Sequence, residues 1–151
     1  MLNDLKPYPF FQGDDGLLYH FDVNRSKWLS VNRETMDFGI NAKKIKGKRY
    51  MASTGKFYSN LSGKKLLRDA TITSISIQTS NVQATFDIHL HKNKVTDSIY
   101  SVSLVNEESK IVDNVNFDLF KNDFIQVSIL NNNVDINYPE VLIEYCWRTT
   151  Y

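Results

Sequence analysis

The sequence predicts an all-β protein, an antiparallel β-sandwich of the jelly-roll type with about eight strands and an extended N-terminal arm. Three observations predict this fold. From residue 82 to residue 90 every second residue is apolar, which is the period of a strand with one buried face. Turn-forming residues recur about every ten residues between such runs. No stretch carries apolar residues at the period of an amphipathic helix.

Composition sets the size and class of the protein. A chain of 151 residues with 42% hydrophobic and 23% charged residues is typical of one globular domain with a real core. The single cysteine, Cys146, lies in an apolar run, which predicts a small buried residue in a disulfide-free chain. No window approaches the roughly 18 apolar residues of a membrane span. The first residues also lack the pattern of a signal peptide, so we expect no membrane partner.

Residues 1–16 are predicted to form an extended N-terminal arm, ahead of a single sandwich domain over residues 17–151. Pro7 and Pro9 favour extended backbone around three aromatic residues, Tyr8, Phe10 and Phe11. Such an arm needs a surface to lie on, either on its own domain or on a neighbouring subunit. We therefore predict that these three aromatic residues contact a partner.

The next elements follow from the same alternation. Residues 17–23 and 28–31 are predicted strands, whereas residues 32–41 show no apolar period and are predicted to be a loop. Residues 71–79 and 82–92 are predicted to pair as an antiparallel hairpin, because Ser80 and Asn81 between them favour a turn.

The C-terminal part is predicted to be strands throughout. The last strand has apolar residues on both faces, Leu142 and Cys146 opposite Ile143 and Tyr145, which predicts a central strand covered on both sides. Together with it, the expected C-terminal strands are residues 98–105, 115–119, 124–130 and 141–148.

Charge is segregated along the chain. Residues 42–68, a predicted loop region with one or two short strands, hold nine basic residues and no acidic one, whereas the net charge of the whole chain is +1. Tyrosine and phenylalanine lie among these bases, a combination that also suits nucleic acid. The charge distribution favours contact with an acidic neighbouring copy or partner, or a plain solvated surface, over nucleic acid. The predicted contact residues are Lys43, Lys44, Lys46, Lys48 and Arg49.

Catalytic patterns are absent from the sequence. It holds no nucleophile elbow or phosphate-binding loop, and its carboxylates are scattered singly, so we predict a protein that is not an enzyme and has no cofactor. Asp87, His89 and His91 point to one side of one strand. Two histidines and one aspartate need further ligands, which a symmetry axis could supply, so we interpret them as a solvated strand face rather than a metal site.

Aromatic residues on small β-sandwiches also serve as sugar platforms, and this is the alternative function. Trp147 follows the apolar face of the last strand, and we assign it to the core. The candidates for a platform are Trp28, Tyr8, Tyr58 and Tyr151.

Two passages carry a resemblance to a known family. Residues 22–30 (DVNRSKWLS), followed by Phe-Gly at 38–39, resemble a segment found ahead of small β-domains in phage virion proteins. The strand ending at 91–93 and the turn at 120–124 are similar to jelly-roll domains of tail-fibre, head-fibre and C1q/TNF-like type. The sequence departs from the common form at Asn122, where that turn often carries glycine. The resemblance implies a virion module, frequently trimeric, with no enzymatic residues.

The expected function is therefore a non-enzymatic structural component of a phage particle, a capsid-decoration, fibre or tail subunit assembled in the host cytoplasm. Its expected partners are other virion proteins and further copies of itself, with a trimer favoured. The alternative is a carbohydrate- or receptor-binding β-sandwich module that takes a host-surface glycan. A small metal-dependent enzyme on a jelly-roll scaffold is a third hypothesis.

Overall fold

The computed structural model describes residues 10–53, 59, 62–81, 84–93 and 98–150, and throughout these residues the regular structure is β-strand. None of them belongs to a helix that could cross a membrane. The all-β prediction is confirmed. The strands are β1 (Phe10–Gln12), β2 (Leu18–Asp22), β3 (Lys27–Ser30), β4 (Glu34–Gly39), β5 (Ile45–Tyr50), β6 (Lys64–Lys65), β7 (Ala70–Gln78), β8 (Ala84–Lys92), β9 (Tyr100–Glu107), β10 (Ser109–Val112), β11 (Phe117–Leu119), β12 (Phe124–Ile136) and β13 (Glu140–Thr149).

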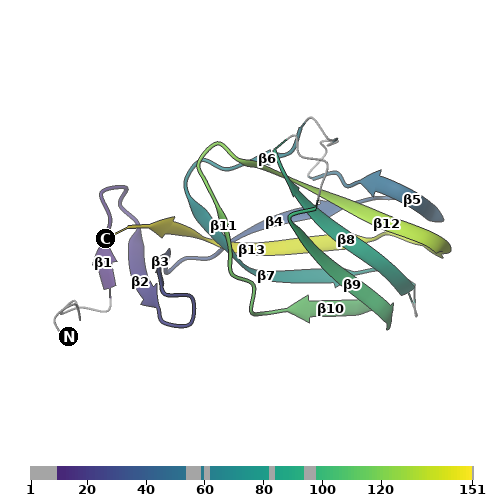
Figure 1. The fold of residues 1–151 in the computed structure, drawn as a ribbon, viewed down its shortest axis with the longest axis horizontal. Helices are drawn as coiled ribbons and strands as arrows, with labels where there is room; N and C mark the ends of the chain where they lie inside the picture. Colours follow the sequence, from purple (N-terminus) through teal and green to yellow (C-terminus); the bar gives the residue numbers. More distant parts are fainter. Residues whose placement is uncertain (1–9, 54–58, 60–61, 82–83, 94–97, 151) are drawn as a thin grey trace.

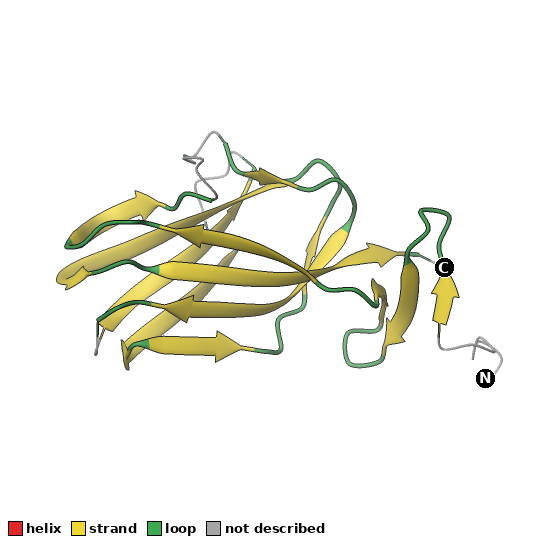
Figure 2. Ribbon diagram, turned by 180° about the vertical axis from the view of Figure 1, so that it is seen from behind, coloured by secondary structure: helices red, strands yellow, loops and turns green. Residues whose placement is uncertain are grey.

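The strands form two antiparallel sheets that face each other (Figures 1 and 2). One sheet of the sandwich has the order β4-β13-β7, with β10 and β11 sharing the far side of β7, and the other has the order β5-β12-β8-β9 with β6 beside β12. We count the strands of the sandwich from β4 and leave out the short strands β6 and β11. The first strand then pairs with the last, the second with the second last, and so on inward: β4–β13, β5–β12, β7–β10 and β8–β9. This is a long hairpin rolled into two sheets, which is the jelly-roll arrangement.

The predicted hairpin over residues 71–92 is wrong. β7 and β8 follow each other in the sequence, but β7 pairs with β13, β10 and β11 in one sheet, and β8 pairs with β12 and β9 in the other. Ile75 and Ile88 are both fully buried, one on the inner face of each sheet. Alternation identifies the buried face of a strand and leaves its hydrogen-bonding partner open, so the error is one of pairing and not of strand position.

The predicted loop at residues 32–41 is also wrong, because residues 34–39 form the edge strand β4. Met36 and Phe38 are buried against the core, while Thr35 and Asp37, which alternate with them, are exposed. The strand is short and holds only two core residues, and its charged neighbours hide the alternation in the sequence.

The core lies between the two sheets and is built from the inward-facing residues of both. Val141 and Ile143 of β13 are fully buried there, and β13 lies between β7 and β4, so its predicted central position is confirmed. The predicted cover on both faces is wrong at Leu142, which is 40% exposed on the outer face. Cys146 is buried, as predicted, and Trp147 packs partly buried against the core. Burying an aliphatic side chain such as that of Val141 or Ile143 contributes roughly 1.5–3 kcal/mol to folding.

The turn between β11 and β12 explains the departure from the resembling family. Asn122 has a φ of 74°, a left-handed conformation that glycine adopts freely and asparagine tolerates better than most residues. Its backbone N–H donates to the carbonyl oxygen of Leu66 at 2.9 Å. Asparagine therefore fills the place of the glycine without changing the turn.

Strands β1, β2 and β3 form a meander at one end of the sandwich, which we call the N-terminal meander (residues 10–30). It continues the first sheet, because Leu29 and Trp28 of β3 pair with Arg148 and Thr149 at the end of β13. In Figure 1 the N-terminal meander stands beyond the end of the two packed sheets, next to the C-terminus of the chain.

Candidate docking surfaces

The N-terminal meander holds together through an aromatic cluster on one of its faces. The register pairs Phe11 with Tyr19 and Phe21 with Trp28, so all four rings share that face. Phe11 stacks on Tyr19 with ring centroids 5.5 Å apart and meets Trp28 edge-on at 4.9 Å. Phe21 also contacts Trp28, with ring centroids 5.4 Å apart. Contacts of this geometry contribute about 0.5–1.5 kcal/mol each beyond their buried area.

The opposite face of the meander carries two exposed apolar side chains among polar ones. Phe10 pairs with His20 and Gln12 with Leu18, so Phe10 and Leu18 lie diagonally on neighbouring strands of that face. Phe10 is 51% exposed and Leu18 is 49% exposed. Phe21 is also 43% exposed, on the face of the aromatic cluster. Exposed apolar groups gathered on one small element are typical of an interaction site.

The turn after β1 is tied to β2 through Asp15 and Tyr19. The Tyr19 hydroxyl donates to Oδ2 of Asp15 at 2.6 Å, and the backbone N–H of Leu17 donates to Oδ1 at 3.0 Å. The pKa of Tyr19 is raised to about 12, mainly because the ring is buried and secondly because of this hydrogen bond. The same hydrogen bond is the main cause of a lowered pKa for Asp15.

Arg25 anchors the meander to the sandwich. Its guanidinium donates to three carbonyl oxygens of the sandwich, those of Val115 at 2.9 Å, Thr73 at 3.1 Å and Asp113 at 3.2 Å. It also forms an ion pair of 2.8 Å with Asp22. Burial opposes ionisation of Asp22, but the bonds from the Arg25 side chain and backbone outweigh it and lower the pKa of Asp22. The planar fork of arginine suits this four-way contact.

Asp118 forms a second anchor between the meander and the sandwich. Its carboxylate accepts from Lys27 of β3 at 2.7 Å and from the hydroxyl of Thr71 at 2.7 Å, and it pairs with Arg148 of β13. Burial alone raises the pKa of Asp118, and the hydrogen bonds from Lys27 and Thr71 outweigh it, so the pKa is lowered overall. The meander is thus held at two points and carries its apolar groups on a fixed base.

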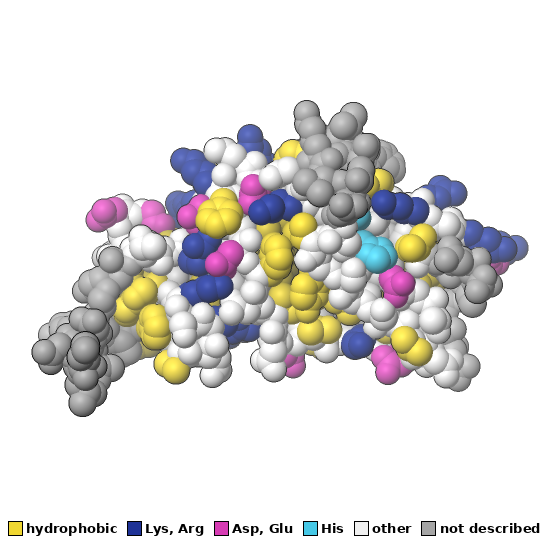
Figure 3. Space-filling model, in the orientation of Figure 1, with side chains coloured by type: hydrophobic (Ala, Val, Ile, Leu, Met, Phe, Trp, Pro, Cys, Tyr) yellow, Lys and Arg dark blue, Asp and Glu magenta, His cyan; other side chains and the backbone are white. Residues whose placement is uncertain are grey.

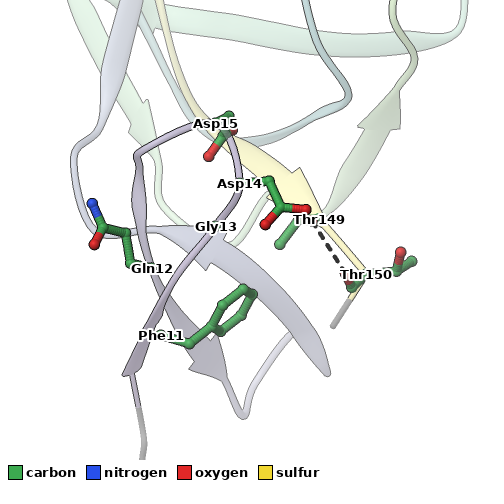
Figure 4. Close-up of a pocket in the computed structure, with 7 residues that line it drawn as sticks. All are labelled: Phe11, Gln12, Gly13, Asp14, Asp15, Thr149 and Thr150. Carbon is green, nitrogen blue, oxygen red and sulfur yellow. Dashed lines mark hydrogen bonds between the residues drawn. The ribbon is translucent and has the colours of Figure 1, made fainter.

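A hollow of about 570 Å³ lies where the meander meets the C-terminal end of the chain (Figure 4). It runs from the turn after β1, with Asp14 and Asp15, to Thr149 and Thr150 at the end of β13. Asp15 is already engaged with Tyr19 and Arg68, and the Thr149 hydroxyl donates to the carbonyl oxygen of Thr150. The hollow therefore offers few free polar groups to a ligand.

The predicted basic contact residues lie along β5 and the turn before it, at the edge of the second sheet. All five are exposed, and we call this set the basic edge: Lys43, Lys44, Lys46, Lys48 and Arg49. Figure 3 shows Lys and Arg side chains gathered along the outer end of β5. Among the described residues, the one ion pair of the basic edge joins Lys46 and Asp135 at 3.2 Å.

Of the predicted aromatic contacts, Phe10 is exposed and Phe11 is half-buried in the aromatic cluster. Tyr8 lies outside the described residues, as do the platform candidates Tyr58 and Tyr151. Trp28 is half-buried between Phe11 and Phe21. The structure thus brings Phe10, Phe11 and Trp28 onto one element and places the basic edge on another. Sequence reasoning did not single out Leu18 and Phe21, because alternation alone does not tell which apolar residues of a strand stay exposed.

The prediction of a solvated face for His91 is wrong. His91 is 2% exposed, and its Nε2 shares a hydrogen bond of 2.8 Å with the Ser128 hydroxyl, while His89 pairs with Ser101 at 2.9 Å. Gln126, which the register places opposite His91, donates to the carbonyl oxygen of Ser59 at 2.8 Å. In the described part of the chain, no group of three His, Cys, Asp or Glu side chains could hold a metal ion.

The fold defines a class: a jelly-roll β-sandwich with an anchored meander at one end. No protein family and no curated protein matches the sequence. Among solved structures, the chain is similar to the PRD1 vertex protein P5, with a TM-score of 0.50 and 9% sequence identity. The similarity covers 95% of this chain and 84% of that chain. At this identity the likeness is one of fold.

Proposed function

We propose that the chain is a non-enzymatic structural component of a phage particle that docks on neighbouring virion proteins. The observation that carries the proposal is the N-terminal meander, which stands out from the jelly roll, is anchored by Arg25 and Asp118, and leaves Phe10 and Leu18 half exposed. An apolar pair on an anchored projection is suited to bind another protein, because little conformational entropy is lost when a fixed element docks.

The fold likeness supports the same role. A PRD1 vertex protein has this arrangement of strands over most of both chains. In our proposal the chain is likewise part of a virion, as a capsid-decoration, fibre or tail subunit assembled in the host cytoplasm. Phe10, Phe11 and the basic edge are the contact residues of the proposal, and Tyr8 belongs to it from the sequence alone.

The chemistry of Trp28 favours docking over the carbohydrate alternative. The ring of Trp28 contacts two other aromatic rings, those of Phe11 and Phe21, and the residue is half-buried. A sugar platform needs an open aromatic face, whereas the exposed apolar groups of the meander are spread over both of its faces and include an aliphatic side chain: Phe10, Leu18 and Phe21. Those groups suit a protein surface better than a glycan.

Particle fractionation tests the proposal. An antibody raised against the purified chain is used on density-gradient fractions of virus particles from cells that express it, and for immunogold electron microscopy. We expect the chain to co-sediment with intact particles at a constant copy number and to be labelled at fixed positions. A chain that stays in the soluble fraction at the top of the gradient contradicts a structural role.

A further inference from the structure

One flank of the sandwich carries both signs of charge in separate patches. The edge strands β4 and β5 both lie on this flank (Figures 1 and 2), and Gly39 and Ala52 exchange two backbone hydrogen bonds of 2.8 and 2.9 Å across it. The basic edge follows β5. On the other side, Asp37 of β4 and Glu140 of β13 present two exposed carboxylates, which we call the acidic pair.

A groove of about 840 Å³ lies on this flank, next to the acidic pair. Asp37 and Glu140 line it together with three aromatic residues, Phe38, Tyr50 and Tyr138. Tyr138 is 43% exposed and has a φ of 48°, and its backbone N–H donates to the carbonyl oxygen of Ala42 at 2.8 Å. Aromatic side chains therefore line the groove, and the backbone of Tyr138 is held by a hydrogen bond.

Within one copy the two patches do not neutralise each other. Lys43 lies over the Tyr138 ring at 5.8 Å and Lys48 over the Tyr50 ring at 5.6 Å, so both bases point across aromatic rings. Glu140 accepts a hydrogen bond from Gln78 at 2.6 Å, which leaves its charge uncompensated. In the part of the chain that the structure describes, no ion pair joins the basic edge to the acidic pair.

We propose that this flank binds the same flank of a second copy of the chain. The two copies are related by a two-fold axis that runs along the groove, in the plane of the contact. A two-fold rotation exchanges the two sides of a surface, so it places the basic edge of each copy against the acidic pair of the other. Charge complementarity then forms twice in one contact. Tyr50 and Tyr138 lie at its centre, where tyrosine contributes strongly to binding. The inference names a partner for the structural role proposed above and rests on it.

Sedimentation velocity of the full-length chain tests the contact directly. We expect twice the monomer mass at low ionic strength, and a dissociation constant that rises about tenfold or more between 50 and 500 mM salt, because the contact is electrostatic. This measurement needs no variant. A chain that is monomeric at low salt up to high micromolar concentration, or an oligomer that salt leaves unchanged, overturns the proposal.

Charge-swap variants test which residues make the contact. Lys48→Glu with Arg49→Glu, and Asp37→Lys with Glu140→Lys, each place like charges across the axis, so each variant alone is expected to sediment as a monomer. An equimolar mixture restores both complementary pairs and is expected to form the dimer again, which also shows that both variants are folded. Lys121→Glu changes the same charge in an exposed turn away from the flank and is expected to leave the dimer intact.

The possible outcomes separate this inference from the proposed function. If the charge-swap variants stay dimeric, or if the chain forms a trimer that these substitutions do not disturb, the two-fold contact is wrong while a virion role stands. If the chain dimerises as expected and never co-sediments with particles, the contact is right and the virion role is wrong.

Discussion

Arg25 donates its Nε–H to the carbonyl oxygen of Val115 at 2.9 Å, a contact between residues 90 positions apart in the chain. The bond joins the turn after β2 to the segment between β10 and β11, and thus the N-terminal meander to the sandwich. Without it the meander would be held mainly by the short β3–β13 pairing of two residue pairs. Together with the contacts of Asp118, this guanidinium group therefore fixes the orientation of the proposed docking element.

Replacement of Arg25 tests this anchor. Arg25→Ala removes the guanidinium bonds to three carbonyl oxygens and to the Asp22 carboxylate, and we expect a loss of about 2 kcal/mol in the free energy of unfolding. Arg25→Lys restores the charge but not the fork of donors, so we expect it to recover less than half of the loss. Urea denaturation measures both. Arg33→Ala, which removes a largely exposed pair with Glu144, serves as the control and is expected to cost below about 1 kcal/mol. Equal losses at the two positions would contradict the anchor.

Tyr19 predicts a loss of stability in alkali. Its pKa is raised to about 12 in the folded protein from an ordinary value of 10. The unfolded chain therefore releases this proton first as the pH rises, so the stabilisation is complete below pH 10 and is lost between pH 10 and pH 12. Thermal unfolding at pH 9 and pH 11 measures the effect. Tyr19→Phe is expected to be less stable at pH 9 and to show a smaller decrease towards pH 11. An unchanged alkaline decrease in the variant would assign it to other groups, such as Tyr145, whose pKa burial also raises.

Asp118 predicts a loss of stability in acid. Its pKa is lowered in the folded protein, as are those of Asp22 and Asp123. As the pH falls below the ordinary value of 3.8, the unfolded chain takes up protons first, so folding loses this stabilisation progressively. We expect Asp118→Asn to lower stability at pH 7 and to flatten the decrease between pH 5 and pH 3. The same change at exposed Asp14 is the control, and a matching effect there would contradict the assignment.

Phe10 and Leu18 are expected to matter for assembly and not for folding. Both side chains are about half exposed, so Phe10→Ser with Leu18→Ser is expected to change the unfolding free energy by less than about 1 kcal/mol. Incorporation into particles, measured by immunoblot of gradient fractions, is expected to fall at least tenfold. Val105→Ser on β9 removes a similarly exposed apolar residue from the other sheet and is expected to be incorporated normally. Normal incorporation of the double variant would remove the meander from the proposed contact.

Trp28 distinguishes the docking role from the carbohydrate alternative. Because its ring packs between Phe11 and Phe21, Trp28→Ala is expected to destabilise the protein by about 2 kcal/mol. On a glycan array we expect no binding that depends on this residue. Millimolar or tighter binding of a glycan by the wild-type chain, lost in a folded Trp28→Ala variant, would favour the alternative instead.

Several features of the protein follow from local sequence alone. The alternation at Phe86, Ile88 and Leu90 predicts a strand and its buried face, because side-chain direction in a strand reverses at every residue. The apolar residues on both faces of residues 141–148 predict a central strand, and Cys146 is buried as its neighbours indicate. Each of these depends only on residues next to one another in the chain.

Pairing and placement were decided by the tertiary structure. β7 and β8 face each other across the core instead of forming a hairpin, because the pattern of a strand does not name its partner. His91 alternates as a solvated residue does, yet it is buried, with the ring of Tyr50 from β5 beside its own at 5.7 Å. Asp37 and Tyr50 line one groove only because β4 and β5 lie on the same flank. The sequence by itself determined the strands with a clear alternation and their inner faces, since these are local. The tertiary structure alone decided the pairing of the strands, the place of the short edge strand β4, and which outer surfaces stay exposed, since these depend on contacts between residues far apart in the chain.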